Sequence, residues 1–281
     1  MNHPQKWRET VDPFELKFKN FKLNKILGYP HAGNDVFHVK GEFQEREVEA
    51  YIKVARQVGA DIKNEIETIN KLGCSLAPKV IDFDSNFLFC VTLARDGERL
   101  SSLLGDNADM KSLDYLYEYG QALAQIHSVS GEFTKVKDRR FFHIPDKEYF
   151  DELSLEFVHD YLIKQKPKAV NECFCHGDFH YANLLWKDGH LSAILDFELS
   201  GLGNKEFDIA WALIRRPGQA FMVKREEIEL FLSGYSSVAC FDLEYLKYYM
   251  ALVYSYFYKI GIKNSEYVEY VKMVFDELCK R

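Results

Sequence analysis

The chain has 281 residues, of which 47% are hydrophobic and 15% aromatic, and it carries a formal net charge of −7 at pH 7. The apolar content excludes an intrinsically disordered or fibrous protein, and the length suits one large two-lobed unit or two domains. Acidic residues outnumber basic ones by 43 to 36 and no long Lys/Arg run is present, which argues against nucleic acid as a partner and favours a neutral or cationic one.

The first third of the sequence predicts strands around one helix. Apolar residues that alternate or run together indicate five strands, at residues 23–28, 36–39, 48–55, 78–83 and 87–93. Gly41 opens the polar connection between the second and the third of them. Isoleucines at positions 62, 66 and 69 share one helical face and Gly73 is a typical stop, so we expect a helix over residues 61–72.

The periodicity changes beyond Gly97, where apolar residues recur at helical spacing. We expect helices at residues 113–127, 226–235 and 243–281, with short strands around residues 174–175 and 191–197. The sequence therefore predicts an α+β fold with two lobes. Residues 1–94 form a small β-rich lobe with one helix, and residues 95–281 form a larger, mainly helical lobe.

The sequence shows no sign of a membrane or secreted protein. No apolar run approaches the roughly 20 residues that a transmembrane helix needs, and residues 1–9 lack the apolar core of a signal peptide. We therefore expect a cytoplasmic protein with no membrane partner. Six cysteines are too few for a disulfide scaffold in this chain, so we expect them to be reduced.

The most polar cluster lies in the second part of the sequence. Asp178 and Asn183 follow one predicted strand, and Asp196 stands thirteen residues after Asn183 in the next. Phosphoryl transfer from a nucleotide needs a carboxylate that orients the attacking hydroxyl and accepts its proton, and oxygen ligands for magnesium. Asp178 suits the role of the base, and Asn183 and Asp196 suit the metal. A polar turn whose Asp and Asn only satisfy backbone groups is the alternative.

Three segments resemble the signature of the aminoglycoside phosphotransferase and choline kinase superfamily, at residues 178–183, 194–198 and 206–210. Residues 120–127 are similar to the helix before the catalytic loop in that family, and Gly33-Asn34 resembles the start of its phosphate-covering hairpin. The resemblance covers most of the chain. It implies a protein-kinase-like fold, ATP or GTP as the phosphoryl donor, and Mg²⁺ as a cofactor.

The resemblance also implies roles for single residues. In the family a strand lysine contacts the nucleotide phosphates and pairs with a helix glutamate, which implies Lys53 with Glu65 and leaves Glu67 as the alternative. Only one of the two glutamates can turn inward, because they point to different faces of the helix. His176 and Asp208 are implied as structural braces. The implied nucleotide-binding residues are Gly33, Asn34, Lys53 and Glu65, with a hinge for the adenine edge at Thr92, Leu93, Ala94 and Arg95.

Two other glycine patterns fail on chemistry. Gly28-x4-Gly33 lacks the Lys and Ser/Thr that a P-loop needs, and Gly201-x-Gly203 is followed by a glutamate that would repel a pyrophosphate. The loop after Gly28 also has fewer glycines than its counterpart in protein kinases, and it contains Pro30 and His31. The phosphate-covering loop is therefore the least specific part of the resemblance.

A zinc site is a further alternative that the sequence disfavours. Cys173, Cys175, His176 and His180 are possible zinc ligands, with the two histidines at the spacing of a metalloprotease helix. Gly177 is, however, a poor helix residue, and no glutamate lies between the histidines. Two cysteines on one face of a strand are more often buried core residues than zinc ligands.

The sequence therefore predicts an ATP-dependent kinase that phosphorylates a hydroxyl group of a small molecule. The complete residue set argues against a kinase-like binding protein without turnover, and the lack of Asp-Phe-Gly and Ala-Pro-Glu after Asp196 argues against a protein kinase. An aminoglycoside or an amine alcohol is the favoured acceptor, and homoserine or a sugar is the alternative. The oligomeric state is left open.

Acidic residues before the catalytic loop favour a cationic acceptor. If they line the pocket, they would attract an amine, but solvated acidic helix faces are the common alternative. These residues are Asp146, Glu148, Asp151, Glu152, Glu156 and Asp160.

Overall fold

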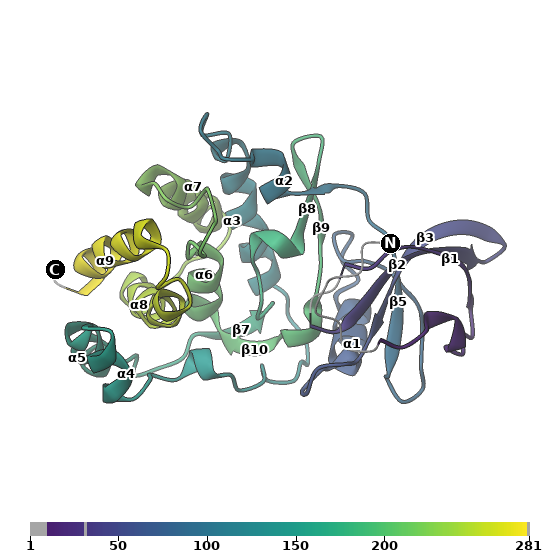
Figure 1. Cartoon of the computed structure of the whole chain (residues 1–281), viewed down its shortest axis with the longest axis horizontal. Helices are drawn as coiled ribbons and strands as arrows, with labels where there is room; N and C mark the ends of the chain where they lie inside the picture. The colour runs from purple at the N-terminus through teal and green to yellow at the C-terminus, as the bar shows by residue number, and fades with distance from the viewer. Residues whose placement is uncertain (1–9, 31–32, 280–281) are drawn as a thin grey trace.

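The computed structural model describes residues 10–30 and 33–279 (Figure 1). Its first part is an antiparallel sheet of five strands in the order β1-β2-β3-β5-β4. The strands are β1 Phe21–Gly28, β2 Asp35–Phe43, β3 Arg46–Val54, β4 Val80–Phe83 and β5 Phe89–Leu93. Alternate residues of β2 and β3, including Phe37 and Ile52, fill one apolar core. All five predicted strands are present, and the first three are longer than predicted.

Gly41 lies inside β2, so the prediction that it opens a connection was wrong. The ring of Phe21 in β1 covers this position so closely that a β-carbon would overlap it. Glycine is therefore needed here for packing and not for a turn. The chain turns instead at Gln44 and Glu45, whose φ angles are 50° and 62°. Two residues with positive φ form the turn that suits the twist of a hairpin.

Helix α1 Ile62–Leu72 follows β3 and packs on the sheet through Ile62 and Ile66, which contact Cys90 of β5. Asp61 caps its start by accepting a hydrogen bond from the backbone of Asn64 at 3.0 Å. Gly73 ends it with a left-handed φ of 53°. The predicted helix is confirmed at both ends, and its inward face lies next to β3.

The rest of the described chain is mainly helical. Most of its helices lie together on one side of the molecule, and the five-stranded sheet lies on the other (Figure 1). One large apolar core, which includes Phe150, Phe231 and Tyr254, holds these helices together. The helices are α2 Leu100–Leu104, α3 Leu113–His127, α4 Lys147–Glu152, α5 Glu156–Lys164, α6 Lys205–Leu213, α7 Arg225–Ser236, α8 Leu243–Ile260 and α9 Ser265–Cys279. Short 3-10 turns are η1 Pro13–Glu15, η2 Arg140–Phe142, η3 Tyr181–Asn183 and η4 Phe197–Leu199.

Two small sheets carry the polar segments. β6 Glu98–Arg99, β8 Leu184–Lys187 and β9 His190–Ile194 form one sheet, and β7 Glu172–Cys175 pairs with β10 Gly201–Asn204 in the other. The loop from β7 to β8 and the loop from β9 to β10 therefore lie between the same two sheets. The predicted strand at residues 191–197 ends earlier, at Ile194, because Asp196 has a left-handed backbone.

The connection between the two parts is short. β5 ends at Leu93, and Glu98 in β6 already pairs with Trp186 of β8. The division of the chain at residues 94 and 95 stays a prediction. Within residues 10–30 and 33–279, no helix combines the length and the apolar character needed to cross a membrane. Cys74, Cys90, Cys173, Cys175 and Cys240 are thiols outside any disulfide bond.

Candidate active site

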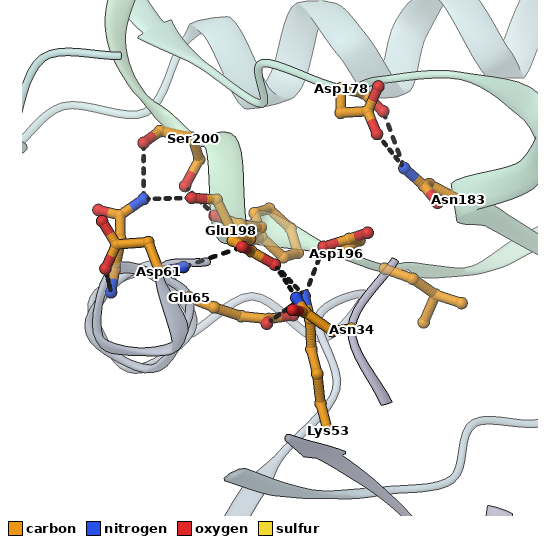
Figure 2. Close-up of polar contacts among 12 residues, drawn as sticks. Asn34, Lys53, Asp61, Glu65, Asp178, Asn183, Asp196, Glu198 and Ser200 are labelled. Carbon is orange, nitrogen blue, oxygen red and sulfur yellow. Dashed lines mark hydrogen bonds and ion pairs between the residues drawn. The ribbon is translucent and has the colours of Figure 1, made fainter. Parts of the chain in front are cut away.

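Lys53 lies near the end of β3, and its ammonium group is surrounded by carboxylates from separate segments (Figure 2). Its Nζ atom is 2.8 Å from Oε2 of Glu65 in α1, 2.8 Å from Oδ1 of Asp196 and 2.7 Å from Oε2 of Glu198. Glu67, on another face of α1, pairs instead with a surface lysine at 3.8 Å. Of the two glutamates between which the sequence could not decide, Glu65 is the one that pairs with Lys53.

The cluster around Lys53 contains more negative than positive charge. Burial alone would lower the pKa of Lys53, but Glu65, Asp196 and Glu198 together raise that pKa well above its ordinary value. Burial raises the pKa of Glu65 to about 7, against the opposing effect of Lys53. The Asp196 side chain is 39% exposed, whereas that of Glu198 is 6% exposed. A second cation can therefore approach the cluster at Asp196.

Glu198, to which the sequence analysis gave no role, connects the two parts of the chain. Its Oε1 accepts a hydrogen bond from the backbone of Asp61 at 2.8 Å, and its Oε2 accepts one from Nδ2 of Asn34 at 2.9 Å. The Asn34 oxygen accepts from two backbone N–H groups just after β3. Because these contacts engage the Asn34 side chain, the predicted phosphate contact would use the backbone of Gly33 and Asn34.

Asp178 lies in the loop between β7 and β8, on the other side of the site from Lys53 (Figure 2). Its Oδ1 accepts a hydrogen bond from Nε1 of Trp211 at 2.8 Å, and its Oδ2 accepts one from Nδ2 of Asn183 at 3.1 Å. Burial alone would raise the pKa of Asp178, but the hydrogen bond and charge of His180 and the charge of Arg216 lower it to about 2. Asp178 is therefore an ionised carboxylate held in a fixed orientation.

His176 fixes the position of Asp178 relative to Asp196. Its Nδ1 accepts a hydrogen bond from the backbone of Asp178 at 3.2 Å, so its Nε2 carries the hydrogen and donates to the carbonyl of Leu195 at 3.0 Å. Burial lowers the pKa of His176, which keeps the imidazole neutral. The backbone of Leu195 also donates to the carbonyl of Asn183 at 2.8 Å. Both ends of the loop that carries Asp178 are thus bonded to Leu195, the residue before Asp196.

Asp208 in α6 braces the same loop. Its two oxygens accept hydrogen bonds from the backbone of His176 at 2.9 Å and of Gly177 at 3.1 Å. His127 in α3 contacts the same carboxylate at 3.2 Å. The resemblance implied a structural brace at Asp208, and these bonds order the segment just before Asp178.

Asn183 and Asp196 offer the donor atoms that Mg²⁺ prefers. The Nδ2 group of Asn183 is bonded to Asp178, which leaves its Oδ1 as the atom available to a metal. Asp196 has φ 65° and ψ 66°, an uncommon conformation for a non-glycine residue that is typical of functional sites. An amide oxygen and an exposed carboxylate beside excess negative charge fit a hard divalent cation.

The predicted hinge segment joins the two parts of the chain. The backbone N–H of Leu93 donates to the carbonyl of Lys79, and that of Ala94 donates to the carbonyl of Glu49, both at 2.9 Å. The guanidinium of Arg95 donates to the carbonyl of Ser192 in β9 at 2.8 Å. A nucleobase edge would therefore meet other backbone groups of residues 92–95. His31, in the expected phosphate-covering loop, lies outside the described residues.

The four possible zinc ligands of the sequence do not gather in one place. His176 uses both ring nitrogens for the bonds to Asp178 and Leu195, and it lies in a loop and not in a helix. Cys173 and Cys175 lie with their sulfurs 3.8 Å apart on β7. The hydrogen bond with the Cys173 thiol, together with burial, raises the pKa of Cys175 well above its ordinary value. Cys175 is buried as predicted for a core residue, whereas Cys173 is only half-buried.

The acidic residues that suggested a cationic acceptor lie on exposed surfaces. Asp146 caps α4 by accepting from the backbone of Tyr149, and Asp151 and Glu152 pair with surface lysines. All six carboxylates, Asp146, Glu148, Asp151, Glu152, Glu156 and Asp160, are exposed. Their placement is that of solvated helix faces.

Comparisons with known proteins agree with this geometry. A model of the phosphotransferase enzyme family matches residues 30–244. The aminoglycoside 3′-phosphotransferase of Niallia circulans is 25% identical over 235 residues, which cover 75% of this chain and 82% of that protein. The choline kinase of Streptococcus pneumoniae has a TM-score of 0.59 at 17% identity and covers 95% of each chain. An amicoumacin kinase in complex with AMP-PNP and Ca²⁺ has a TM-score of 0.60 at 14% identity, covering 92% of this chain and 90% of that one.

At these identities the solved structures show the fold alone. In both, the likeness extends over nearly the whole chain, from the small sheet with its helix to the helical part. The predicted α+β, protein-kinase-like fold is therefore confirmed.

Proposed function

The chain belongs to the phosphotransferase enzyme family, the family that its motifs resemble, and we propose that it transfers the γ-phosphoryl group of ATP to a hydroxyl group of a small molecule. One observation carries the proposal. Lys53 with Asp196 faces Asp178 with Asn183 (Figure 2). The backbone of Leu195 is bonded to both ends of the loop that carries Asp178. This is the arrangement that an in-line transfer between two substrates needs.

The nucleotide binds on the side of the first sheet. Lys53 contacts the phosphates, because it is the cation nearest Asp196, and Glu65 holds its ammonium in place at 2.8 Å. The backbone of Gly33 and Asn34 covers the phosphates, and residues 92–95 meet the base. ATP is the favoured donor, since the related amicoumacin kinase was solved with AMP-PNP; GTP is the alternative.

Asp178 acts on the acceptor. Trp211 and Asn183 orient its carboxylate toward the attacking hydroxyl. Asp178 accepts the hydroxyl proton as the new O–P bond forms, and the bond between the γ-phosphorus and the bridging oxygen of ADP breaks. A pKa of about 2 makes Asp178 a weak base, but a loose transition state needs orientation more than basicity.

Asn183 and Asp196 hold Mg²⁺ through their side-chain oxygens. When bound, Mg²⁺ neutralises charge on the nucleotide phosphates. The excess negative charge around Lys53 supports this assignment, because a single ammonium faces three carboxylates.

A thermal-shift titration tests the nucleotide site first. ATP with Mg²⁺ at 100 times its Kd stabilises the folded protein by about 2.7 kcal/mol, which raises the Tm by several degrees. ADP release is then measured over amine alcohols, aminoglycosides, sugars and hydroxy acids. No stabilisation by any nucleotide, with or without Mg²⁺, would contradict the proposed function.

The class of acceptor is the finer part of the proposal. The relatives are named for an aminoglycoside, for choline and for amicoumacin, and the sequence favoured an aminoglycoside or an amine alcohol over homoserine or a sugar. A catalytically silent binding protein is disfavoured, because Lys53, Asp178 and Asp196 are all present in a connected site.

A further inference from the structure

Two arginines from distant segments contact Trp211, the residue that donates a hydrogen bond to Asp178. Arg139 precedes η2 and Arg216 follows α6, and each guanidinium lies on the ring of Trp211, at 5.3 Å and 5.1 Å from its centroid. Trp211 in turn donates its Nε1 hydrogen to Asp178 at 2.8 Å. Positive charge is thus concentrated next to the carboxylate that orients the acceptor.

Among residues 10–30 and 33–279, no carboxylate forms an ion pair with either arginine. Nη2 of Arg139 donates to the carbonyl of Gly177 at 2.6 Å, and Nη2 of Arg216 donates to the carbonyl of Trp211 at 3.2 Å. In the described part of the chain, Nη1 of Arg216 is buried without a hydrogen-bond partner. A guanidinium has five N–H donors, and a largely buried one without an anion in contact is costly.

The nearby acidic groups do not supply the missing anion. Asp178 and Asp208 act on Arg139 only through space, and burial outweighs them and lowers the pKa of Arg139. The Asp208 oxygens are already bonded to the backbone of His176 and Gly177. Both guanidinium groups therefore have N–H groups that can donate hydrogen bonds to an anion from outside the chain.

Arg139, but not Arg216, also lines a pocket in the second part of the chain. Its cavity volume is about 130 Å³, which holds a small anionic group but is below the roughly 300–1,000 Å³ of a whole small-molecule site. No residue of the five-stranded sheet or of α1 lines it, so it is separate from the nucleotide side. The lining residues are Val136, Arg139, Phe142, Cys175, Gly177, Gly203, Asn204, Phe207, Asp208 and Tyr249.

We propose that the acceptor carries an anionic group, a carboxylate or a phosphate, which Arg139 and Arg216 bind beside Asp178. This inference rests on the proposed function and adds the charge of its substrate. A guanidinium matches the planar, two-oxygen edge of either anion. The anchored anion holds a hydroxyl of the acceptor next to Asp178, and the aromatic side chains of Phe142, Phe207 and Tyr249 line the space beside Arg139. A cationic acceptor would instead meet two positive charges.

The γ-phosphate of ATP is the other source of an anion at this place. Lys53 and Asp196 already lie on the nucleotide side, and Arg139 lines a pocket built only from the second part of the chain. These positions favour the acceptor. The two sources are distinguished kinetically, because an arginine that binds the γ-phosphate affects the KM for ATP and one that binds the acceptor affects the KM for the acceptor.

The test uses acceptors that differ in charge on one carbon skeleton. Glucuronate, glucose and glucosamine form one set, and glycerate, glycerol and 3-aminopropane-1,2-diol form a second, with hexose phosphates and the wider hydroxyl panel beside them. ADP release is measured for the full-length protein and for the variants Arg216→Gln, Arg216→Lys and Arg139→Gln. Arg225→Gln is the matched control, because this exposed arginine pairs with Glu229 on the surface of α7.

We expect the best acceptor to be an anion. Arg216→Gln should raise its KM by about 10- to 100-fold, the usual cost of a hydrogen bond to a charged group, while the KM for ATP stays within about twofold. Arg216→Lys should recover part of the loss, Arg139→Gln should act in the same direction, and Arg225→Gln should change nothing. A Tm measured for each variant confirms that it is folded.

Three results would overturn the inference. The first is that the best acceptor is neutral or cationic. The second is that neither arginine variant changes the KM for an anionic acceptor. The third is that the arginine variants change only the KM for ATP. Each of these leaves the proposed kinase activity intact. The proposed function itself fails only if no nucleotide binds or no acceptor is phosphorylated.

Discussion

Replacing Glu198 by glutamine tests the connection between the two parts of the chain. The carboxylate accepts one hydrogen bond from the backbone of Asp61 and one from Asn34, and it lies 2.7 Å from Lys53. Glutamine has one acceptor oxygen, so one of the two donors would face an amide NH₂ group. An unsatisfied buried donor costs about 1–3 kcal/mol. The lost attraction to Lys53 is partly offset, because Glu65 and Asp196 no longer face a third negative charge.

We therefore expect Glu198→Gln to lower the free energy of unfolding by about 2 kcal/mol and the Tm by about 4–6 °C. The KM for ATP should rise by about tenfold, since Asn34 and the start of α1 are no longer bonded to the segment after Asp196. Calorimetry and ADP-release kinetics measure the two effects. Glu67→Gln, on the exposed face of α1, is the control and should change stability by less than about 0.5 kcal/mol. A Tm within 1 °C of the parent would refute this reasoning.

Three further variants test the metal ligands and the brace. Asp196→Ala should abolish Mg²⁺-dependent ADP release, and Asn183→Ala should weaken it less, because a neutral amide oxygen is the weaker ligand; full activity at ordinary Mg²⁺ levels would remove either residue from this role. His176→Ala should lower kcat by about 10- to 100-fold and also lower the Tm, because it loses its bonds to both Asp178 and Leu195; an unchanged kcat would show that the loop holds its position without the imidazole.

The sequence predicted the fold well where local signals agree with tertiary packing. The helix over residues 61–72 has a capping aspartate, regular isoleucines and a terminal glycine, and it is present at both predicted ends. Gly41 was misread because a glycine signals a turn locally, whereas the ring of Phe21 that requires it is twenty residues away in the chain. β10 was not predicted, since Gly-Leu-Gly-Asn has weak strand preference and pairs only because β7 lies beside it.

The candidate site was predictable only in its motif residues. Asp178, Asn183 and Asp196 stand at recognisable spacings, and Lys53 follows from the resemblance. Glu198 is visible two residues after Asp196, but its partners Asp61 and Asn34 come from far earlier in the chain. Trp211, Arg139 and Arg216 give no local signal at all, because only the folding of separate segments brings them to Asp178. The acidic residues between positions 146 and 160 suggested a cationic acceptor in the sequence, but in the structure they are exposed to solvent.

The central claim is that Asp178 orients the acceptor hydroxyl and accepts its proton. Asp178→Asn keeps the size of the side chain and removes the proton acceptor, so kcat should fall by about 10²–10⁴-fold while the Kd for AMP-PNP stays within about twofold. Steady-state ADP release with the best acceptor, together with calorimetric AMP-PNP binding, measures both quantities on the same preparation. A kcat close to that of the parent enzyme, with nucleotide binding intact, would contradict the claim.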